Sequence, residues 1–279
     1  MSGARKAESK DKQVDQLTTF GKETEEHLFG KDLSPEDKDF AIEVKNLSKH
    51  FGERRVLDNL EFALPKGAFL SIFGPNGAGK SVLLSILASL SKPSEGELFL
   101  NGINAFKEPE KARAIVGLVS HSSLLYPDLT AQENLEFFAN LYGINNAREQ
   151  ADCALERVGL KQRRYDMVRD FSCGMTQRLS IARALIGNPQ ILLLDEPYSG
   201  LDPKATKVLD FILQQEKENR TIVMVSHDLE KGLALCSHAL ILAKRKIAFF
   251  EERDCIDASG FTDIYYEACL GGAIKNEAR

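Results

Sequence analysis

The sequence lacks an excess of basic residues, and this argues against a nucleic-acid partner. Its 279 residues include 36 lysines and arginines against 41 aspartates and glutamates, so the formal net charge is -5. The isoelectric point of the sequence is near 5.7, so the overall charge gives no electrostatic reason to bind the phosphate backbone of a nucleic acid. We therefore expect no nucleic acid among the partners of this chain.

Cysteine is too scarce and too scattered for a disulfide framework. The five cysteines are Cys153, Cys173, Cys236, Cys255 and Cys269. Their number is odd and no Cys-x-x-Cys pair occurs, which fits a reducing compartment. The cysteines and histidines also show no haem-attachment spacing, so we expect no direct haem binding.

Long apolar runs are missing as well. No run approaches the roughly 20 residues that a membrane-spanning helix needs. The first residues are polar and charged, without the apolar segment of a secretory signal. We expect a cytoplasmic protein that reaches the membrane only as a peripheral subunit, through its partners.

The character of the chain changes near residue 40. Residues 1–39 are rich in Lys, Glu, Asp, Ser and Gln, which predicts a disordered charged tail. From 40 to 252, apolar strands alternate with helices, which predicts an α/β fold with a mostly parallel sheet. A polar-faced helical block at about 121–187 is expected to be an inserted subdomain, and 253–279 a C-terminal appendage. No internal repeat is visible.

A glycine-rich stretch between two apolar runs has the spacing Gly, four residues, then Gly-Lys-Ser. This spacing is typical of a phosphate-binding loop, whose backbone N–H groups surround a phosphate at the start of a helix. A simple glycine turn is the alternative, and a chance match has a probability on the order of one in a hundred. The stretch comprises Gly74, Pro75, Asn76, Gly77, Ala78, Gly79, Lys80 and Ser81.

Two residues of the loop carry specific expectations. Lys80 can reach the β and γ phosphates of a nucleotide, and the Ser81 hydroxyl can bind Mg²⁺. Upstream, Phe51 precedes Gly52 and can stack on an adenine, although an ordinary hairpin aromatic is the alternative. The sequence thus predicts ATP and Mg²⁺ as ligands.

Polar residues also follow two buried strands. Asp195 ends the run 191–194 and is placed to hold Mg²⁺, and Glu196 can activate a water. His227 follows the run 221–225 and can donate to the γ-phosphate. Alternatively, Asp195 and Glu196 could simply be a solvent-exposed strand end, and His227 could be a structural histidine. The phosphate loop in the same chain makes these the weaker interpretations.

Taken together, these motifs resemble the ATP-binding-cassette family of ATPases. The resemblance covers about 40–250 and includes six elements in the family's order: Phe51, GPNGAGKS at 74–81, FSCGMTQR at 171–178, ILLLDEP at 191–197, SGLD at 199–202 and SHD at 226–228. It implies an ATP hydrolase that works as a head-to-tail homodimer with two ATP molecules between the protomers.

The resemblance also assigns roles to Ser172 and Gly174, which approach the γ-phosphate held by the partner protomer. The family usually reads Leu-Ser-Gly-Gly-Gln here, whereas this chain has Cys173 and Met175. A further departure is His121, where the family generally has Gln as a sensor of Mg²⁺ or of the attacking water. His121 is therefore a candidate for both catalysis and metal binding.

The loop around His121 further resembles the ATP-binding subunit of the haem exporter used in cytochrome c maturation. We expect a subunit that drives transport through separate integral-membrane subunits, with haem export as one candidate. Other bacterial exporters share the Asp-Leu-Thr-x-x-Glu-Asn-Leu run at 128–135. A soluble cassette protein without a transport role, and a nucleotide-binding regulator without turnover, are further alternatives.

Overall fold

The computed structural model describes residues 39–270. The predicted tail at 1–39, except its last residue, and the end of the predicted appendage lie outside the described residues. Within the described part, no helix is long and apolar enough to cross a membrane. All five cysteines are free thiols.

A six-stranded sheet carries the site, in the strand order β10-β9-β3-β8-β7-β6. The pairings among β9, β3, β8, β7 and β6 are parallel, and only β10 runs antiparallel to its neighbour β9. The strands are β3 (Phe69–Phe73), β6 (Val116–Val119), β7 (Ile191–Asp195), β8 (Thr221–Val225), β9 (His238–Ala243) and β10 (Lys246–Glu252). The predicted mostly parallel α/β sheet is therefore confirmed.

A second sheet is entirely antiparallel, with the order β2-β1-β4-β5. The predicted mostly parallel sheet did not include this separate antiparallel one. The long neighbouring strands β1 and β2 are joined by the short turn at Gly52, so they pair as a hairpin before the chain enters the parallel sheet. The strands are β1 (Phe40–Phe51), β2 (Arg54–Pro65), β4 (Glu95–Leu100) and β5 (Ile103–Asn104).

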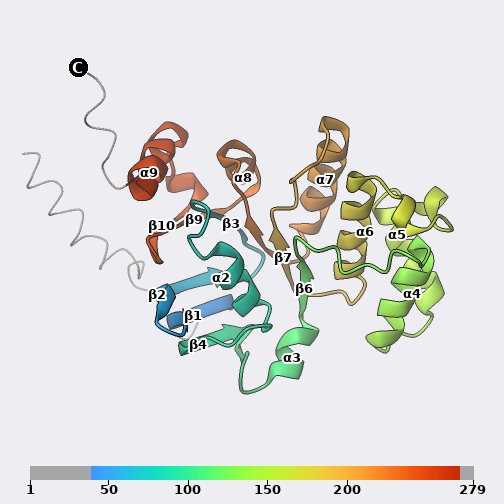
Figure 1. Ribbon diagram of the computed structural model, residues 1–279, viewed down its shortest axis with the longest axis horizontal. Helices are drawn as coiled ribbons and strands as arrows, with labels where there is room; N and C mark the ends of the chain where they lie inside the picture. The colour runs from blue at the N-terminus through green and yellow to red at the C-terminus, as the bar shows by residue number, and fades with distance from the viewer. Residues whose placement is uncertain (1–38, 271–279) are drawn as a thin grey trace, which may run out of the picture. The chain divides into compact units, whose positions relative to one another are not determined.

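The helices cover both faces of the six-stranded sheet. Helices α4, α5 and α6 gather beyond the edge strand β6, away from the antiparallel sheet (Figure 1). The α-helices are α2 (Lys80–Leu87), α3 (Pro109–Ala114), α4 (Ala131–Leu141), α5 (Ala147–Arg157), α6 (Cys173–Leu185), α7 (Pro203–Glu216), α8 (Leu229–Leu235) and α9 (Ala258–Leu270). Short 3₁₀ turns are η1 (Lys161–Arg163), η2 (Val168–Asp170) and η3 (Arg253–Cys255).

Two apolar cores lie on the two faces of this sheet. On β7, Leu192 and Leu194 join the core that contains α4 to α9, whereas Ile191 and Leu193 join the core with α2 and the antiparallel sheet. This alternation follows from the two-residue period of a strand. Because both faces are covered, the parallel strands β3, β6, β7 and β8 are almost entirely apolar, and Asp195 and Thr221 lie at strand ends. The exception is Ser71 in the middle of β3, whose buried hydroxyl donates to the Gly232 carbonyl at 2.9 Å.

The sequence pattern predicts helices over 80–90 and 179–186, and one end of each differs in the structure. Helix α6 begins at Cys173, because the Ser172 hydroxyl accepts a hydrogen bond from the Met175 backbone N–H at 3.3 Å and caps it. Helix α2 ends at Leu87, and Ser89 has a positive φ of 56°. The spacing of Thr130 and Glu133 also predicts a capping box for the helix that follows, and α4 has this box.

Helix α9 packs against the strand that leads into the phosphate loop. Phe261 is fully buried, with its ring centroid 5.4 Å from Phe73 and 5.5 Å from Phe249. Phe73 is the last residue of β3 and directly precedes Gly74. The C-terminal helix therefore buries an aromatic side chain beneath the start of this loop.

Candidate functional site

The glycine-rich loop joins β3 to α2, as the strand-loop-helix pattern predicts. Gly79 has a φ of +104°, and a Cβ there would lie 2.7 Å from Leu57 Cδ2. A Cβ on Gly74 would lie 2.2 Å from the Leu242 carbonyl oxygen. Only glycine fits at these two positions, because of the left-handed backbone at Gly79 and the close contact at both. The loop therefore brings its backbone to the N-terminus of α2, where N–H groups can bind an anion.

Lys80 is the first residue of α2 and lies inside the curve of the loop. Its ammonium donates hydrogen bonds to the carbonyl oxygens of Gly74 at 2.7 Å and Pro75 at 3.1 Å. Burial lowers the pKa of Lys80, and the charges of Glu196 and Asp195 act in the opposite direction. A phosphate in the loop would meet both this ammonium and the backbone N–H groups.

The next residue, Ser81, meets the end of strand β7. Its hydroxyl oxygen lies 3.4 Å from Asp195 Oδ1. Burial raises the pKa of Asp195, and the Ser81 hydrogen bond and the charges of His121 and Lys80 oppose that rise. A hydroxyl and a carboxylate are hard oxygen ligands, of the kind that Mg²⁺ takes together with water and phosphate oxygens. The pair thus fits this cation, although the described residues hold no cluster of three or more metal-binding side chains.

Glu196 and His227 come together at the ends of the neighbouring strands β7 and β8. Glu196 Oε2 lies 3.4 Å from His227 Nδ1, and the His227 side chain is 62% exposed. The backbone of Glu196 has a φ of 49°, and its N–H donates to the Val225 carbonyl at 3.1 Å. A left-handed conformation at a glutamate costs roughly 1–3 kcal/mol and recurs at functional sites. This backbone turns the Glu196 carboxylate toward the end of β8.

His121 follows β6 and belongs to the same edge of the sheet. It is exposed, and its charge is among those that act on Asp195. The parallel order β8-β7-β6 explains this proximity, since the carboxyl ends of parallel strands meet at one edge. The structure therefore places five predicted residues around one edge of the sheet: Lys80, Ser81, Asp195, Glu196 and His121, with His227 beside Glu196.

Three predicted residues stand apart from this group. Phe51 ends β1, is 55% exposed and has the Lys49 ammonium 4.9 Å from its ring centre. Ser172 and Gly174 start α6, and no hydrogen bond of residues 39–270 joins either of them to the phosphate loop. A Cβ on Gly174 would instead lie 2.8 Å from Ala205 Cβ, on α7. Among the described residues, no hydrogen bond therefore links the start of α6 to the phosphate loop.

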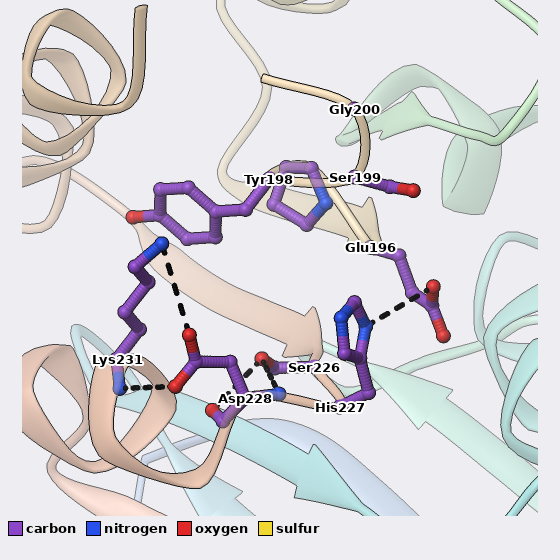
Figure 2. Close-up of a pocket in the computed structure, with 9 residues that line it drawn as sticks. Glu196, Tyr198, Ser199, Gly200, Ser226, His227, Asp228 and Lys231 are labelled. Atoms are coloured by element: carbon purple, nitrogen blue, oxygen red, sulfur yellow. Dashed lines mark hydrogen bonds and ion pairs between the residues drawn. The ribbon is translucent and has the colours of Figure 1, made fainter. Parts of the chain in front are cut away.

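The structure adds two residues that the sequence analysis missed, Tyr198 and Lys231. Both line a cavity with Glu196 and His227, shown in Figure 2. Tyr198 follows Glu196 by two positions, but no local pattern indicates its partner Asp210, twelve residues further along the chain. Only the packing of α7 against the end of β7 brings these two together.

A parallel sheet with a phosphate loop at its first parallel strand, and acidic residues at the end of a neighbouring strand, define a P-loop nucleotide-binding domain. The family model described as ABC transporter matches residues 57–199. The chain belongs to the ABC transporter family, as an ATP-binding subunit of the ATP-hydrolysing type.

Curated relatives support the same family. Linearmycin resistance ATP-binding protein LnrL of Bacillus subtilis is 35% identical over 204 residues, covering 72% of this chain and 66% of that protein. Nod factor export ATP-binding protein I of Cupriavidus metallidurans is 35% identical over 227 residues, covering 80% and 75%. ABC transporter ATP-binding protein NatA of Bacillus subtilis is 33% identical over 216 residues, covering 75% and 88%.

Solved structures agree in fold. The ATP-binding subunit of an ABC transporter matches with a TM-score of 0.74 and 27% identity, over 82% of this chain and 99% of that one. A dimeric ATP-binding cassette in a post-hydrolysis state, bound to ADP and phosphate, matches with a TM-score of 0.69 and 30% identity, over 76% and 98%. The predicted ABC-type fold is confirmed. The names of the relatives concern linearmycin resistance and Nod factor export, so they give the haem-export prediction no support.

Proposed function

We propose that this chain is the ATPase subunit of a bacterial-type ABC exporter and drives transport through separate integral-membrane subunits. The observation that carries the proposal is the convergence of Lys80, the Ser81–Asp195 pair and the Glu196–His227 pair at one edge of the parallel sheet. ATP hydrolysis requires a charge clamp, a metal site and a positioned water, and these groups can supply all three.

Each step of ATP binding and hydrolysis can be assigned to groups of this chain. Gly74, Gly77 and Gly79 let the loop backbone surround the phosphates, and Lys80 neutralises their charge. Glu196 accepts a proton from the attacking water, and His227 donates a hydrogen bond to the γ-phosphate.

Asp195, directly or through water, and Ser81 would hold Mg²⁺ with the phosphate oxygens. His121 is a further candidate ligand or sensor at this position. The cation, when bound, would neutralise charge that develops on the β and γ phosphates. The loop residues Pro75, Asn76 and Ala78 would contribute backbone groups only.

A homodimer would complete the site. Ser172 and Gly174 lie at the start of α6, where no described hydrogen bond joins them to the loop of their own chain, and a helix N-terminus favours a negatively charged ligand. In a head-to-tail pair, this end of α6 would face the γ-phosphate held by the partner. The dimeric cassette with ADP and phosphate is a structural relative that supports this arrangement. Phe51 would stack on the adenine of ATP.

The names of two relatives support an exporter, since they concern resistance to linearmycin and export of Nod factor. The coupled membrane subunits would contact the helical block near His121 at the cytoplasmic face. Haem export lacks such support, and a soluble cassette protein without a membrane partner is the second candidate. Stimulation of ATP turnover by cognate membrane subunits in vesicles distinguishes these classes, because a soluble cassette protein would show none.

The His121→Ala variant is expected to lower ATP turnover roughly tenfold, the scale of losing one well-placed hydrogen bond of about 1.4 kcal/mol. It is also expected to lose stimulation by the membrane subunits. The measurement is phosphate release with and without these subunits in vesicles. His121→Gln should retain both properties, and His50→Ala serves as the control because His50 is exposed and has no assigned role. Unchanged turnover and stimulation in His121→Ala would remove the role assigned to this residue.

Variants of Ser172 test whether ATP makes the chain form the proposed homodimer. In a background in which Glu196→Gln slows hydrolysis, ATP is expected to double the mass measured by light scattering, whereas ADP is not. Adding Ser172→Arg should keep the chain monomeric, because a long cation then occupies the exposed start of α6. Ser172→Thr retains the capping hydroxyl and should still dimerise. A chain that remains monomeric in ATP, with its membrane subunits supplied, would overturn the proposal.

A further inference from the structure

A cavity of about 140 Å³ lies beside the Glu196–His227 pair. Two segments form its walls, one following β7 and the other following β8 (Figure 2). Its lining residues are Glu196, Pro197, Tyr198, Ser199, Gly200, Ser226, His227, Asp228 and Lys231. The pairing of β7 with β8, which places Asp195 opposite Val225, fixes where the two segments begin. Beyond that point, the spacing of the Glu196 and His227 side chains depends on what holds the segments together across the cavity.

Tyr198 is anchored at its hydroxyl end. The hydroxyl donates to Asp210 Oδ1 at 2.7 Å, a short bond to a carboxylate on α7. Burial raises the pKa of Tyr198, and the hydrogen bond with Asp210 acts in the same direction. The phenol therefore stays protonated and remains a donor at every physiological pH.

The ring of Tyr198 contacts the other segment. The ammonium of Lys231, on α8, lies 5.3 Å from the ring centre, within the range of a cation–π contact. Lys231 is in turn tied to Asp228 at two points. Its backbone N–H donates to Asp228 Oδ1 at 3.0 Å, and its ammonium lies 3.7 Å from Asp228 Oδ2.

Asp228 also restrains the backbone on either side of His227, its neighbour in the chain. The Asp228 backbone N–H donates to the Ser226 hydroxyl at 3.1 Å, and the same hydroxyl donates to the Asp228 carbonyl at 3.1 Å. These bonds close a tight turn at the end of β8 from which the His227 side chain projects toward Glu196. A series of contacts thus leads from the His227 backbone through Asp228 and Lys231 to the Tyr198 ring.

We propose that Tyr198 is a positioning residue for ATP hydrolysis: by bridging Asp210 and Lys231, it sets the distance between the Glu196 carboxylate and the His227 imidazole. We call these two contacts the Tyr198 bridge. The inference rests on the proposed function, because it assigns Glu196 and His227 to the reaction. Tyr198 itself touches neither nucleotide nor water in this role.

The bridge acts on the side chains, because the β7–β8 pairing and the bond from the Glu196 N–H to the Val225 carbonyl fix only the backbone. His227 is 62% exposed and Glu196 31% exposed at the side chain, and Glu196 sits on a left-handed backbone. A left-handed backbone at a residue other than glycine is strained, so it persists only where contacts with neighbouring residues hold it in place. A shift of about 1 Å in a catalytic group can cost about a hundredfold in rate, so a contact that fixes this spacing has a kinetic effect.

The test compares variants that remove one or both ends of the bridge. Tyr198→Leu removes both contacts and is expected to lower kcat about tenfold, within the range for misplaced groups, while the KM for ATP changes less than twofold. Tyr198→Phe retains the ring under Lys231 and should show a smaller loss, about threefold. Lys231→Met should resemble Tyr198→Leu, whereas Lys231→Arg retains the cation and should restore kcat to within twofold.

The double variant distinguishes positioning from loss of stability. If the two residues act as one bridge, Tyr198→Leu with Lys231→Met should be no slower than either single variant. Tyr165→Leu is the matched control, because Tyr165 is 62% exposed and its ring also meets a cation, Arg164, at 4.7 Å. Equal kcat for Tyr198→Leu and wild type, or additive losses in the double variant, would overturn the inference.

A second readout does not depend on hydrolysis. The NMR resonances of the His227 imidazole in the nucleotide-free protein should shift in Tyr198→Leu and Lys231→Met, and stay in place in Tyr165→Leu. If the wild-type chain shows no turnover, the proposed function fails while the His227 resonances still decide whether the bridge positions this side chain. Unshifted His227 resonances in Tyr198→Leu would overturn the bridge whatever the turnover.

Discussion

Replacing Glu196 with glutamine is expected to lower ATP turnover about a thousandfold, within the range for removing a general base. Glutamine retains the size and one acceptor oxygen of glutamate but cannot take a proton from water. The contact with His227 Nδ1, at 3.4 Å, can persist as a hydrogen bond. ATP affinity should therefore stay within about threefold of wild type, a difference below 1 kcal/mol.

Two measurements check this expectation. Phosphate release gives the turnover, and equilibrium binding of a fluorescent ATP analogue gives the affinity. Glu61→Gln is the control, because Glu61 is an exposed residue of β2 and its replacement changes the net charge equally. A Glu196→Gln chain that retains more than about a tenth of wild-type turnover would show that another group takes the proton.

Replacing Lys80 with methionine is expected to lower ATP affinity about a hundredfold, since a charged group paired with phosphate contributes roughly 2–5 kcal/mol. Methionine fills a similar volume but carries no charge. In the free protein it also loses the hydrogen bonds to the carbonyl oxygens of Gly74 and Pro75. Lys80 is only 7% exposed, so removing its buried charge offsets part of that loss.

Calorimetric titration with ATP and Mg²⁺ measures the affinity, and circular dichroism during heating checks that the variant is folded. The matched control is Lys107→Met, whose lysine is 75% exposed and pairs with Glu97 at 3.3 Å. Its ATP affinity should equal that of wild type. If Lys80→Met binds ATP normally, the loop would hold phosphate through its backbone N–H groups alone.

Much of the site was predictable because its motifs are local. The spacing from Gly74 to Ser81 specifies a loop that closes on itself, and the apolar run before Asp195 specifies a buried strand with an exposed acidic end. The Asp228 cap that begins α8 was predictable for the same reason. In each case the interacting groups lie within a few residues of each other.

Other features were not predictable because they depend on contacts between distant segments. The separate antiparallel sheet arises from the β1–β4 pairing, which joins distant residues such as Ile42 and Leu100. The start of α6 at Cys173 was missed for a local reason instead: Ser172 is a capping residue, but Gly174 weakens the helical propensity of the first turn. Helix α9 was expected to be an appendage, and its fully buried Phe261 gave no sign of a partner in the local sequence. The division into domains stays a prediction.

The sequence by itself determined the class of chemistry, because a phosphate loop and strand-end carboxylates need only short-range spacing to be recognised. The tertiary structure alone decided which of these groups meet: Ser81 with Asp195, Glu196 with His227, and Tyr198 with Asp210 and Lys231. Those pairs arise from the order of β3, β8 and β7 in the sheet and from the packing of α7 and α8 on it. Strand order depends on how the connecting helices cross over and pack on the two faces of the sheet, which is a property of the whole domain.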